Sequence, residues 1–218
     1  MNILVFSAHA DDETLGAGGY LLKAAQERHT IGWFNFTNKT VEYGYDIDEV
    51  SMRNLEINMV RESYEFDFFF DFGLQPAKLD IYPRAFLVEK VSEQIEHFRP
   101  NIVLVPFAYD AHSDHQIASD VVISCTKSFR VSSINEILIM EIISETDYGK
   151  RCFCPNYFVD ITGFIDKKIE IMKIYKSEIK SAPFPRSEDK IRALASFRGA
   201  AINSFYAEAF KVFKIIER

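Results

Sequence analysis

The sequence predicts a single α/β domain over residues 1–218, with a mainly parallel sheet flanked by helices. Apolar segments of strand length alternate along the chain with longer segments in which apolar residues recur at helical spacing. The first strand-like segment is almost continuously apolar, which is typical of parallel strands that are buried on both faces. No internal repeat, low-complexity tract or linker interrupts the pattern, and 218 residues suit one domain with a large core.

The first half of the chain begins with a buried strand over residues 2–7 and continues with a helix that has several glycines near its start. The next strand contains aromatic and β-branched residues, which favour extended structure. After a polar loop, we expect Asp48 to cap the following helix with its side chain. The elements predicted after the first strand are a helix over 14–28, a strand over 31–37, a loop over 38–46 and a helix over 51–63.

The segment 66–72, with the sequence FDFFFDF, has the most unusual composition of the chain. We interpret it as a buried strand flanked by helices rather than as an exposed apolar patch, because parallel strands are nearly continuously apolar. The segment 82–98 predicts a helix, because its apolar residues recur at helical spacing and form one face. This face consists of Leu87, Val91, Ile95 and Phe98.

The second half of the chain continues the alternation of strands and helices. Pro100 ends the preceding helix, and the short apolar segment 102–106 predicts another buried strand. The segment 207–216 is compatible with either a helix or a strand. The other predicted elements are a helix over 115–129, strands over 136–144 and 156–161, a helix over 164–179, a loop over 182–186 and a helix over 187–204.

The composition argues against several classes of protein. The formal net charge of −7 and the isoelectric point near 5.3 argue against nucleic-acid binding. No segment reaches the ~20 apolar residues of a membrane span. The N-terminal apolar run has no basic flank and breaks at His9, so we expect no signal peptide. The three cysteines form no disulfide framework; we expect a cytoplasmic protein with reduced thiols, and the sequence leaves homo-oligomerisation open.

Two short segments concentrate the side chains that bind metals. The first follows the first predicted strand directly and contains His9, Asp11, Asp12 and Glu13. The second, HSDH over residues 112–115, follows a later strand. In open α/β sheets, ligands bind at the carboxyl ends of the strands. We therefore expect the two segments to meet around one metal ion.

A hydrolytic zinc site needs three protein ligands drawn from histidine and carboxylate, and one open position for water. His9 and Asp12 lie three residues apart on a strand-to-helix turn, close enough to bind one ion. His115 can supply the third ligand from the next loop along the same edge of the sheet. This donor set favours Zn²⁺ as the cofactor; Fe²⁺ and Co²⁺ are compatible with it, whereas Mg²⁺ prefers oxygen ligands.

The same site needs a base that takes a proton from water and a group that stabilises the oxyanion. Asp11 lies between two ligands and must point in a different direction, which suits the base. His112 can face the open position, and we expect Asp114 to orient it and to stabilise its charge. Simpler roles remain open, because Asp12 or Thr14 can cap the helix and the histidines can be ordinary loop residues.

The glycines Gly16, Gly18 and Gly19 also need an explanation. Their spacing does not match the G-x-G-x-x-G pattern of a dinucleotide-binding loop, and carboxylates precede them where a pyrophosphate would lie. We interpret these glycines as positions where the helix packs closely against a strand.

These motifs resemble those of the PIG-L/LmbE family of zinc-dependent deacetylases. The segments AHADDETLGAGG over 8–19 and HSDH over 112–115 are similar to the family's usual AHPDDE and HPDH. The C-terminal segment AEAF over 207–210 also resembles a family pattern, so the likeness runs through most of the chain. The resemblance implies a Rossmann-like α/β fold.

The resemblance also implies roles for the residues of the two motifs. His9, Asp12 and His115 would bind zinc, Asp11 would be the general base, and His112 would act as an electrostatic stabiliser or acid. The implied reaction is removal of the N-acetyl group from an N-acetylglucosamine-type amino sugar or glycoconjugate through a zinc-activated water.

The chain departs from the family pattern at several positions. Ala10 and Ser113 replace prolines, so we expect looser loops. Residues 38–42 lack the glycine–glutamate pattern that is common in this loop, which often contacts the substrate. Arg53 falls where the family carries a similar residue and is a candidate to bind sugar hydroxyls or a phosphate. A helix ion pair with a neighbour such as Glu49 or Glu56 explains Arg53 equally well.

Other functions remain open at this point. A zinc amidase that cleaves a larger amide conjugate would use the same site, and a non-catalytic carbohydrate-binding or metal-binding relative would share the fold. The spare groups Asp11 and His112 argue against the non-catalytic alternative. A Mg²⁺ phosphohydrolase built on Asp11, Asp12 and Glu13 is disfavoured by the histidine ligands. Whether Tyr109 donates a hydrogen bond to the oxyanion also stays open.

Overall fold

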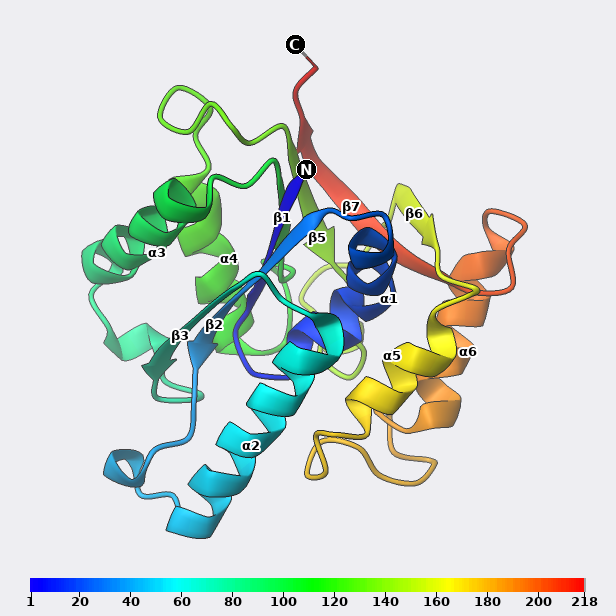
Figure 1. The fold of residues 1–218 in the computed structure, drawn as a ribbon, viewed down its shortest axis with the longest axis horizontal. Helices are drawn as coiled ribbons and strands as arrows, with labels where there is room; N and C mark the ends of the chain where they lie inside the picture. The colour runs from blue at the N-terminus through cyan, green and yellow to red at the C-terminus, as the bar shows by residue number, and fades with distance from the viewer. Residues whose placement is uncertain (218) are drawn as a thin grey trace.

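A single sheet forms the centre of the molecule in the computed structural model, which describes residues 1–217; the last residue of the predicted domain, 218, lies outside the described residues. The strands are β1 (Asn2–Ser7), β2 (Thr30–Thr37), β3 (Phe68–Leu74), β4 (Ile102–Val105), β5 (Glu136–Met140), β6 (Tyr157–Asp160) and β7 (Ala207–Ile215). They form a seven-stranded sheet in the order β3-β2-β1-β4-β5-β7-β6 (Figure 1). β1 to β5 are parallel, and β7 is antiparallel to both of its neighbours. The predicted α/β fold with a mainly parallel sheet is confirmed, and of the segment 207–216, left open between helix and strand, residues Ala207–Ile215 form β7.

Helices cover both faces of the sheet (Figure 1). They are α1 (Asp12–Gln26), α2 (Ile47–Tyr64), α3 (Arg84–Phe98), α4 (Ser113–Cys125), α5 (Ile165–Met172) and α6 (Glu188–Ala200), with short 3-10 turns at Val41–Tyr43, Leu79–Ile81 and Thr146–Tyr148. One apolar core lies between the sheet and α1, α2, α5 and α6, and a second lies between the sheet and α3 and α4. Within residues 1–217, no helix is both long and apolar enough to cross a lipid bilayer.

The central position of β1 determines where the first metal-binding motif lies. Its core residues, from Ile3 to Phe6, are fully buried, as their apolar side chains require. β1 pairs in parallel with β4, with Ile3 opposite Ile102. Because parallel neighbours end at the same edge of a sheet, the loops that follow β1 and β4 lie side by side.

The glycines of α1 allow close packing against the sheet, as we expected from the sequence. A Cβ atom on Gly16 would lie 3.0 Å from Met140 Cβ, and one on Gly19 would lie 2.6 Å from Ile161 Cγ2. A buried ion pair, Lys168 with Glu208, adjoins the same helix; Glu208 Oε1 accepts hydrogen bonds from Gly19 N and Lys168 Nζ, both at 2.7 Å. Any larger side chain at Gly19 would therefore displace its neighbours.

Two local predictions in the first half of the chain are wrong in detail. Asp46, and not Asp48, caps α2, because its side chain accepts a hydrogen bond from Asp48 N at 2.8 Å. The phenylalanine-rich strand β3 lies at the edge of the sheet and is mostly half-buried rather than buried, although helices flank it as predicted: Phe68 packs on Phe98 of α3, and Arg61 of α2 lies over Phe69. Its aromatic rings pack on those of β2, for example Phe70 on Phe34, which explains the composition without full burial.

The helix predicted over 164–179 ends at Met172, and residues 173–187 instead form an irregular segment. Lys176 N donates a hydrogen bond to Glu56 Oε1 at 3.0 Å, so a carboxylate on α2 provides the acceptor that this backbone N–H lacks outside a helix. Tyr175 Oη donates to Glu13 Oε1 at 2.8 Å. These contacts compensate the lost helical hydrogen bonds and bring the segment to the carboxyl edge of the sheet.

Candidate functional site

The structure brings both motifs together around the side chain of Asp12. Its Oδ2 atom lies 3.3 Å from His115 Nε2 and 3.8 Å from His9 Nδ1. One ligand atom from each of these three residues can be chosen so that all lie within 4.8 Å of one another. Asp12 and His115 are buried, whereas His9 is half-buried and faces the solvent-accessible side. Two imidazole nitrogens and one carboxylate oxygen around an open side fit a tetrahedral zinc site.

The charges of this cluster support the same conclusion. Burial alone would raise the pKa of Asp12, but the imidazoles of His115 and His9 lower it overall. Burial would lower the pKa of His115, but Asp12 and Asp110 raise it well above its usual value. The cluster thus stabilises positive charge at its centre, where a cation would take the place of the proton.

The second ring nitrogen of each histidine faces another carboxylate. His9 Nε2 lies 3.1 Å from Asp114 Oδ2, and His115 Nδ1 lies 3.2 Å from Asp110 Oδ2. Such carboxylate partners orient metal-binding imidazoles and select the tautomer whose free nitrogen points at the metal. Asp110 was missed in the sequence, although an aspartate shortly before a histidine ligand is a recognisable signal for this arrangement.

Asp114 has a different partner from the one predicted. We expected its carboxylate to orient His112, but it contacts His9 and accepts hydrogen bonds from Ala77 N at 2.7 Å and Leu79 N at 3.0 Å. Only the backbone of Asp114 bonds to His112, donating from its N–H to His112 Nδ1 at 3.1 Å. Two backbone amides of the loop after β3 thus hold the Asp114 carboxylate beside His9 rather than beside His112.

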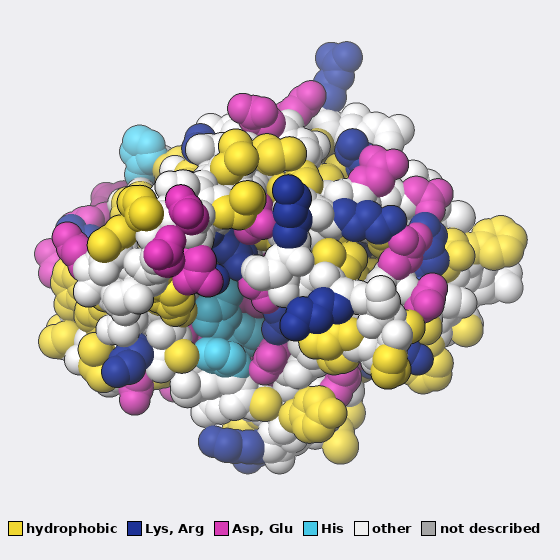
Figure 2. Space-filling model, turned by 90° about the horizontal axis from the view of Figure 1, so that it is seen from below, with side chains coloured by type: hydrophobic (Ala, Val, Ile, Leu, Met, Phe, Trp, Pro, Cys, Tyr) yellow, Lys and Arg dark blue, Asp and Glu magenta, His cyan; other side chains and the backbone are white. Residues whose placement is uncertain are grey.

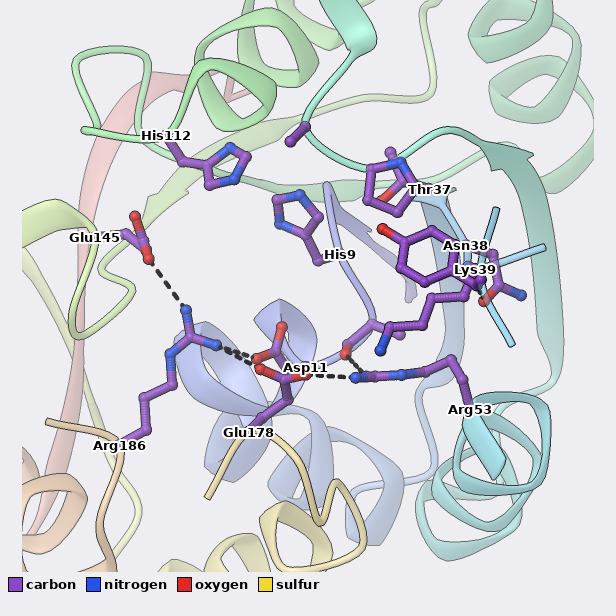
Figure 3. Close-up of a pocket in the computed structure, with 14 residues that line it drawn as sticks. His9, Asp11, Thr37, Asn38, Lys39, Arg53, His112, Glu145, Glu178 and Arg186 are labelled. Carbon is purple, nitrogen blue, oxygen red and sulfur yellow. Dashed lines mark hydrogen bonds and ion pairs between the residues drawn. The ribbon is translucent and has the colours of Figure 1, made fainter. Parts of the chain in front are cut away.

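His112 lies beside the cluster of His9, Asp12 and His115. Its ring centroid is 4.4 Å from that of His9, and its side chain lines the same cavity (Figure 3). Because Nδ1 accepts from the Asp114 amide, the neutral ring carries its proton on Nε2. Burial, followed by the proximity of His9 and His115, lowers the pKa of His112 to about 4, so the ring is neutral near pH 7 and can donate a hydrogen bond.

Asp11 faces the cavity from the turn between His9 and Asp12. Its backbone adopts φ 151° and ψ −22°, a strained conformation of the kind that persists at functional sites. Its Oδ2 atom accepts a hydrogen bond from Arg186 Nη1 at 2.7 Å. Burial raises the pKa of Asp11 well above its usual value, and Arg186 only partly opposes this effect. Asp11 is therefore a stronger base than an exposed carboxylate.

Arg53 supports the first motif from α2. Its Nη1 donates to Ala10 O at 2.8 Å, and its Nη2 donates to Ser177 Oγ at 3.0 Å and to the carboxylate of Glu178. Arg53 Nε lies 3.5 Å from Glu56 Oε2, so the predicted helix ion pair is formed. Arg53 lines the cavity, but acidic partners within the chain already surround its guanidinium group.

Two further residues support the site: Glu13, which the sequence places in the first motif, and Arg186, which was missed in the sequence. Glu13 is buried beneath Asp11, accepts a hydrogen bond from Asp11 N at 3.1 Å, and has its pKa raised by burial to about 7. Arg186 comes from the irregular segment after α5 and also contacts Glu178 and Glu145. No local pattern marks Arg186, because its partners are far away in the chain.

Tyr109, in contrast, is partly exposed and packs against Arg151 rather than lining the cavity.

The site opens into a cavity of about 300 Å³ at the carboxyl edge of the sheet. Figure 2 shows histidine side chains within a hollow of the surface, bordered by acidic and basic side chains. His112, Glu145 and Arg186 lie on one side of this cavity, and Asn38 and Lys39 lie on the opposite side (Figure 3). The cavity can therefore hold a small polar molecule next to Asp11 and the metal-binding cluster.

Comparisons with known proteins agree with this geometry. A model of the family described as GlcNAc-PI de-N-acetylase (PIG-L) matches residues 4–126, more than half of the chain. The diacetylchitobiose deacetylase of Thermococcus kodakarensis is 24% identical over 226 residues, which cover 96% of this chain and 82% of that protein.

Two solved structures show the same fold. The conserved protein TT1542 from Thermus thermophilus has a TM-score of 0.78 at 23% identity, with 99% of this chain and 96% of that chain covered. GalB, the 4-carboxy-2-hydroxymuconate hydratase of Pseudomonas putida, has a TM-score of 0.76 at 15% identity, with 100% and 98% covered. At these identities the likeness concerns the fold alone, and a hydratase on the same fold shows that the fold does not dictate the reaction.

Proposed function

Because the chain belongs to the GlcNAc-PI de-N-acetylase (PIG-L) family of deacetylases, we propose that it removes the N-acetyl group from an N-acetylglucosamine-type substrate with a bound Zn²⁺ ion. One observation carries this proposal: His9 and His115 each turn one ring nitrogen toward Asp12, beside a cavity that Asp11 and His112 line. We propose that residues 1–218 form one catalytic domain.

His9, Asp12 and His115 are the proposed ligands of the ion. When bound, zinc supplies a Lewis acid that lowers the pKa of a water to about 7 and polarises the carbonyl oxygen of the substrate. Asp114 and Asp110 hold the two imidazoles with the correct nitrogens toward the metal. The protein groups thus set the geometry before the substrate enters.

Asp11 is the proposed general base. Its carboxylate takes a proton from the water that attacks the acetamide carbonyl, and its raised pKa favours this transfer. Arg186 holds the carboxylate through the contact at Oδ2, which leaves Oδ1 available to the water. Asp11 then returns the proton to the departing amine, because neutral His112 is a weak source of protons near pH 7.

His112 is the proposed oxyanion donor. The Nε2–H group of its neutral ring donates a hydrogen bond to the oxygen on which negative charge develops during the attack. The backbone amide of Asp114 fixes the ring in this tautomer. His112 and Asp11 thereby serve different steps of one reaction, with one group stabilising charge and the other moving the proton.

The choice of an amino-sugar substrate is supported by the named relative and by the size of the cavity. The Thermococcus kodakarensis protein is by its name a deacetylase of diacetylchitobiose. A cavity of about 300 Å³ is at the small end of the range for ligand pockets and suits one sugar ring with its acetamide group. A larger amide conjugate would have to extend out of the hollow.

A substrate panel with metal analysis tests this function. The full chain is assayed for zinc content and for acetate release from N-acetylglucosamine, diacetylchitobiose and a bulkier N-acetylated amine. We expect one zinc ion per chain and activity on the sugars, and we expect His115→Ala to lose both. The exposed His97 provides a matched control, since His97→Ala should retain both. Zinc retention in His115→Ala, or zinc binding without any acetate release, would contradict the proposal.

A further inference from the structure

The irregular segment 173–187 contacts the first motif at two depths. At the wall of the cavity, Arg186 donates a hydrogen bond to the carboxylate of Asp11 (Figure 3). Beneath the cavity, Tyr175 Oη donates to Glu13 Oε1 at 2.8 Å. Tyr175 is fully buried and cannot touch a substrate, so any effect of its hydroxyl group on the reaction must pass through other residues.

The backbone of Asp11 adopts a conformation that requires support from its surroundings. Its φ of 151° and ψ of −22° lie outside the regions that a residue with a Cβ atom normally occupies. Such a conformation persists only where neighbouring contacts enforce it. The Asp11 carbonyl oxygen accepts hydrogen bonds from Thr14 N at 3.1 Å and Leu15 N at 2.9 Å, and the N–H group donates to Glu13 Oε2 at 3.1 Å. The Glu13 carboxylate is therefore one of the contacts that hold the strained backbone.

Hydrogen bonds to both oxygens hold the Glu13 carboxylate, which is fully buried. Oε2 accepts from Asp11 N and, at 3.4 Å, from Ser7 Oγ. Oε1 accepts from Thr14 Oγ1 at 2.7 Å and from Tyr175 Oη. Ser7, Asp11 and Thr14 are neighbours of Glu13 in the sequence, whereas Tyr175 lies 162 positions away. The tyrosine thus ties the carboxylate to a different part of the molecule.

Tyr175 is itself held firmly. Its ring belongs to the core between the sheet and α1, α2, α5 and α6, and the guanidinium group of Arg53 lies 5.5 Å from the ring centroid. Its backbone N–H donates to Met172 O at 3.1 Å, and its carbonyl oxygen accepts from Glu178 N at 3.0 Å. Because interiors are closely packed, a side chain in this position has little freedom to move, and its hydroxyl group can fix the direction of the Glu13 carboxylate.

We infer that Tyr175 is a positioning residue for the reaction: through Glu13, it keeps Asp11 in the backbone conformation that turns its carboxylate toward the cavity. This inference rests on the proposed deacetylase function and adds a residue that acts through the general base. A catalytic group has to be held within about 0.5 Å of its productive position, and a displacement of about 1 Å can lower a rate about 100-fold. Without the hydroxyl group, the Glu13 carboxylate is free to turn away from Asp11 N, and the strained turn can relax.

Asp12, the proposed zinc ligand in the same turn, has separate support. Its Oδ2 atom accepts a hydrogen bond from His9 N at 2.9 Å and lies 3.3 Å from His115 Nε2. Neither contact involves Glu13 or Tyr175. Loss of the tyrosine hydroxyl group should therefore displace the base and spare metal binding, which distinguishes a positioning role from general damage to the site.

Replacing Tyr175 by Phe tests the inference, because it removes the hydroxyl group and keeps the ring. The zinc-loaded full chain is assayed on the N-acetylated sugar that wild type turns over fastest, and kcat, KM and zinc content are measured. We expect Tyr175→Phe to lower kcat about tenfold, with KM changed less than about twofold and zinc content unchanged. Tyr157→Phe, which alters a half-buried tyrosine of the edge strand β6, should behave like wild type.

A second comparison shows whether Tyr175 acts through the base. In an Asp11→Asn background there is no base to position, so the further change Tyr175→Phe should leave the residual rate unchanged. A role of Tyr175 in general stability would lower this rate again. A tenfold decrease in kcat in both backgrounds would therefore overturn the inference.

Amide hydrogen exchange at Asp11 separates a failure of this inference from a failure of the proposed function. The exchange rate of its N–H group, followed by NMR, needs no substrate. If wild type turns over none of the sugars, faster exchange at Asp11 in Tyr175→Phe than in Tyr157→Phe would support the positioning contact, and equal rates would reject it. If wild type is active, an unchanged kcat in Tyr175→Phe, a change confined to KM, or a loss of zinc would reject the inference and leave the deacetylase function standing.

Discussion

The carboxylate of Asp114 lies 3.1 Å from His9 Nε2, although the two residues are 105 positions apart in the chain. The contact joins the loop after β1 to the first turn of α4, and it directs His9 Nδ1 toward Asp12. Because an ionised carboxylate can only accept, the imidazole carries its proton on Nε2 and keeps a lone pair on Nδ1 for a metal. The contact with Asp114 therefore leaves the Nδ1 lone pair of His9 facing Asp12.

Replacing Asp114 by Asn should weaken metal binding. We expect the zinc affinity of Asp114→Asn to fall about 10–100-fold, because the amide does not favour the metal-binding tautomer of His9 as the carboxylate does. Competition with a chromogenic chelator measures this affinity. Asp120→Asn, on the exposed side of the same helix, should bind zinc like wild type. Equal affinities in the two variants would remove Asp114 from the support of the site.

Replacing Asp11 by Asn should separate metal binding from catalysis. The variant loses the proton acceptor but keeps the shape of the side chain, and Asn tolerates positive φ values better than most residues do. We expect kcat/KM to fall about 10²–10⁴-fold while the zinc content stays constant. Stopped assays of acetate release together with metal analysis would show this. Turnover at the wild-type rate would exclude Asp11 as the base.

Replacing His112 by Ala should reduce kcat through the loss of an oxyanion donor. Burial lowers the pKa of His112 to about 4, so the group is neutral at the pH of the assay and acts through its N–H. We expect a decrease in kcat of about 10²–10³-fold with a smaller change in KM, because the contact forms mainly in the transition state. His112→Ala should still bind zinc. A change confined to KM would indicate a role in substrate binding instead.

Replacing Gly19 by Ala should destabilise the fold. The new Cβ atom would lie 2.6 Å from Ile161 Cγ2, and relief of this overlap should cost about 1–3 kcal/mol of the free energy of unfolding. Gly163→Ala is the matched control, because no atom lies within 4 Å of its Cβ position. Urea denaturation measures both variants. Equal stability of the two would show that α1 can move away from Ile161 at little cost.

The sequence was sufficient for the main strands and for the neighbourhood of the two motifs. Residues 3–6 are too apolar for any place but the interior, and a parallel strand delivers the following residues to the carboxyl edge. The buried face of α3, from Leu87 to Phe98, was also predicted, because apolar residues that recur at helical spacing lie on the side of a helix that faces the core. The buried strands and the apolar helix face were predictable because each depends on the pattern of apolar residues within a short stretch of the chain.

Contacts between distant segments could not be predicted in this way. Asp114 was expected to serve its neighbour His112, but the amides of Ala77 and Leu79 fix its carboxylate beside His9. Arg186 reaches Asp11 across 175 positions, from a segment for which the sequence pattern predicted no role. A hydrogen-bonding side chain takes the nearest unsatisfied partner in space, and no pattern in its own neighbourhood identifies that partner.

The amino-acid sequence alone therefore specified the type of fold and a cluster of side chains near His9 and His115 that could hold a metal ion, because strand burial and donor chemistry depend on residues close together in the chain. Folding added the assignment of partners: which carboxylate lies beside which imidazole, and which acidic side chains pair with Arg53 and Arg186. The physical reason is that electrostatic and hydrogen-bonding contacts act over a few ångströms of space, regardless of separation along the chain.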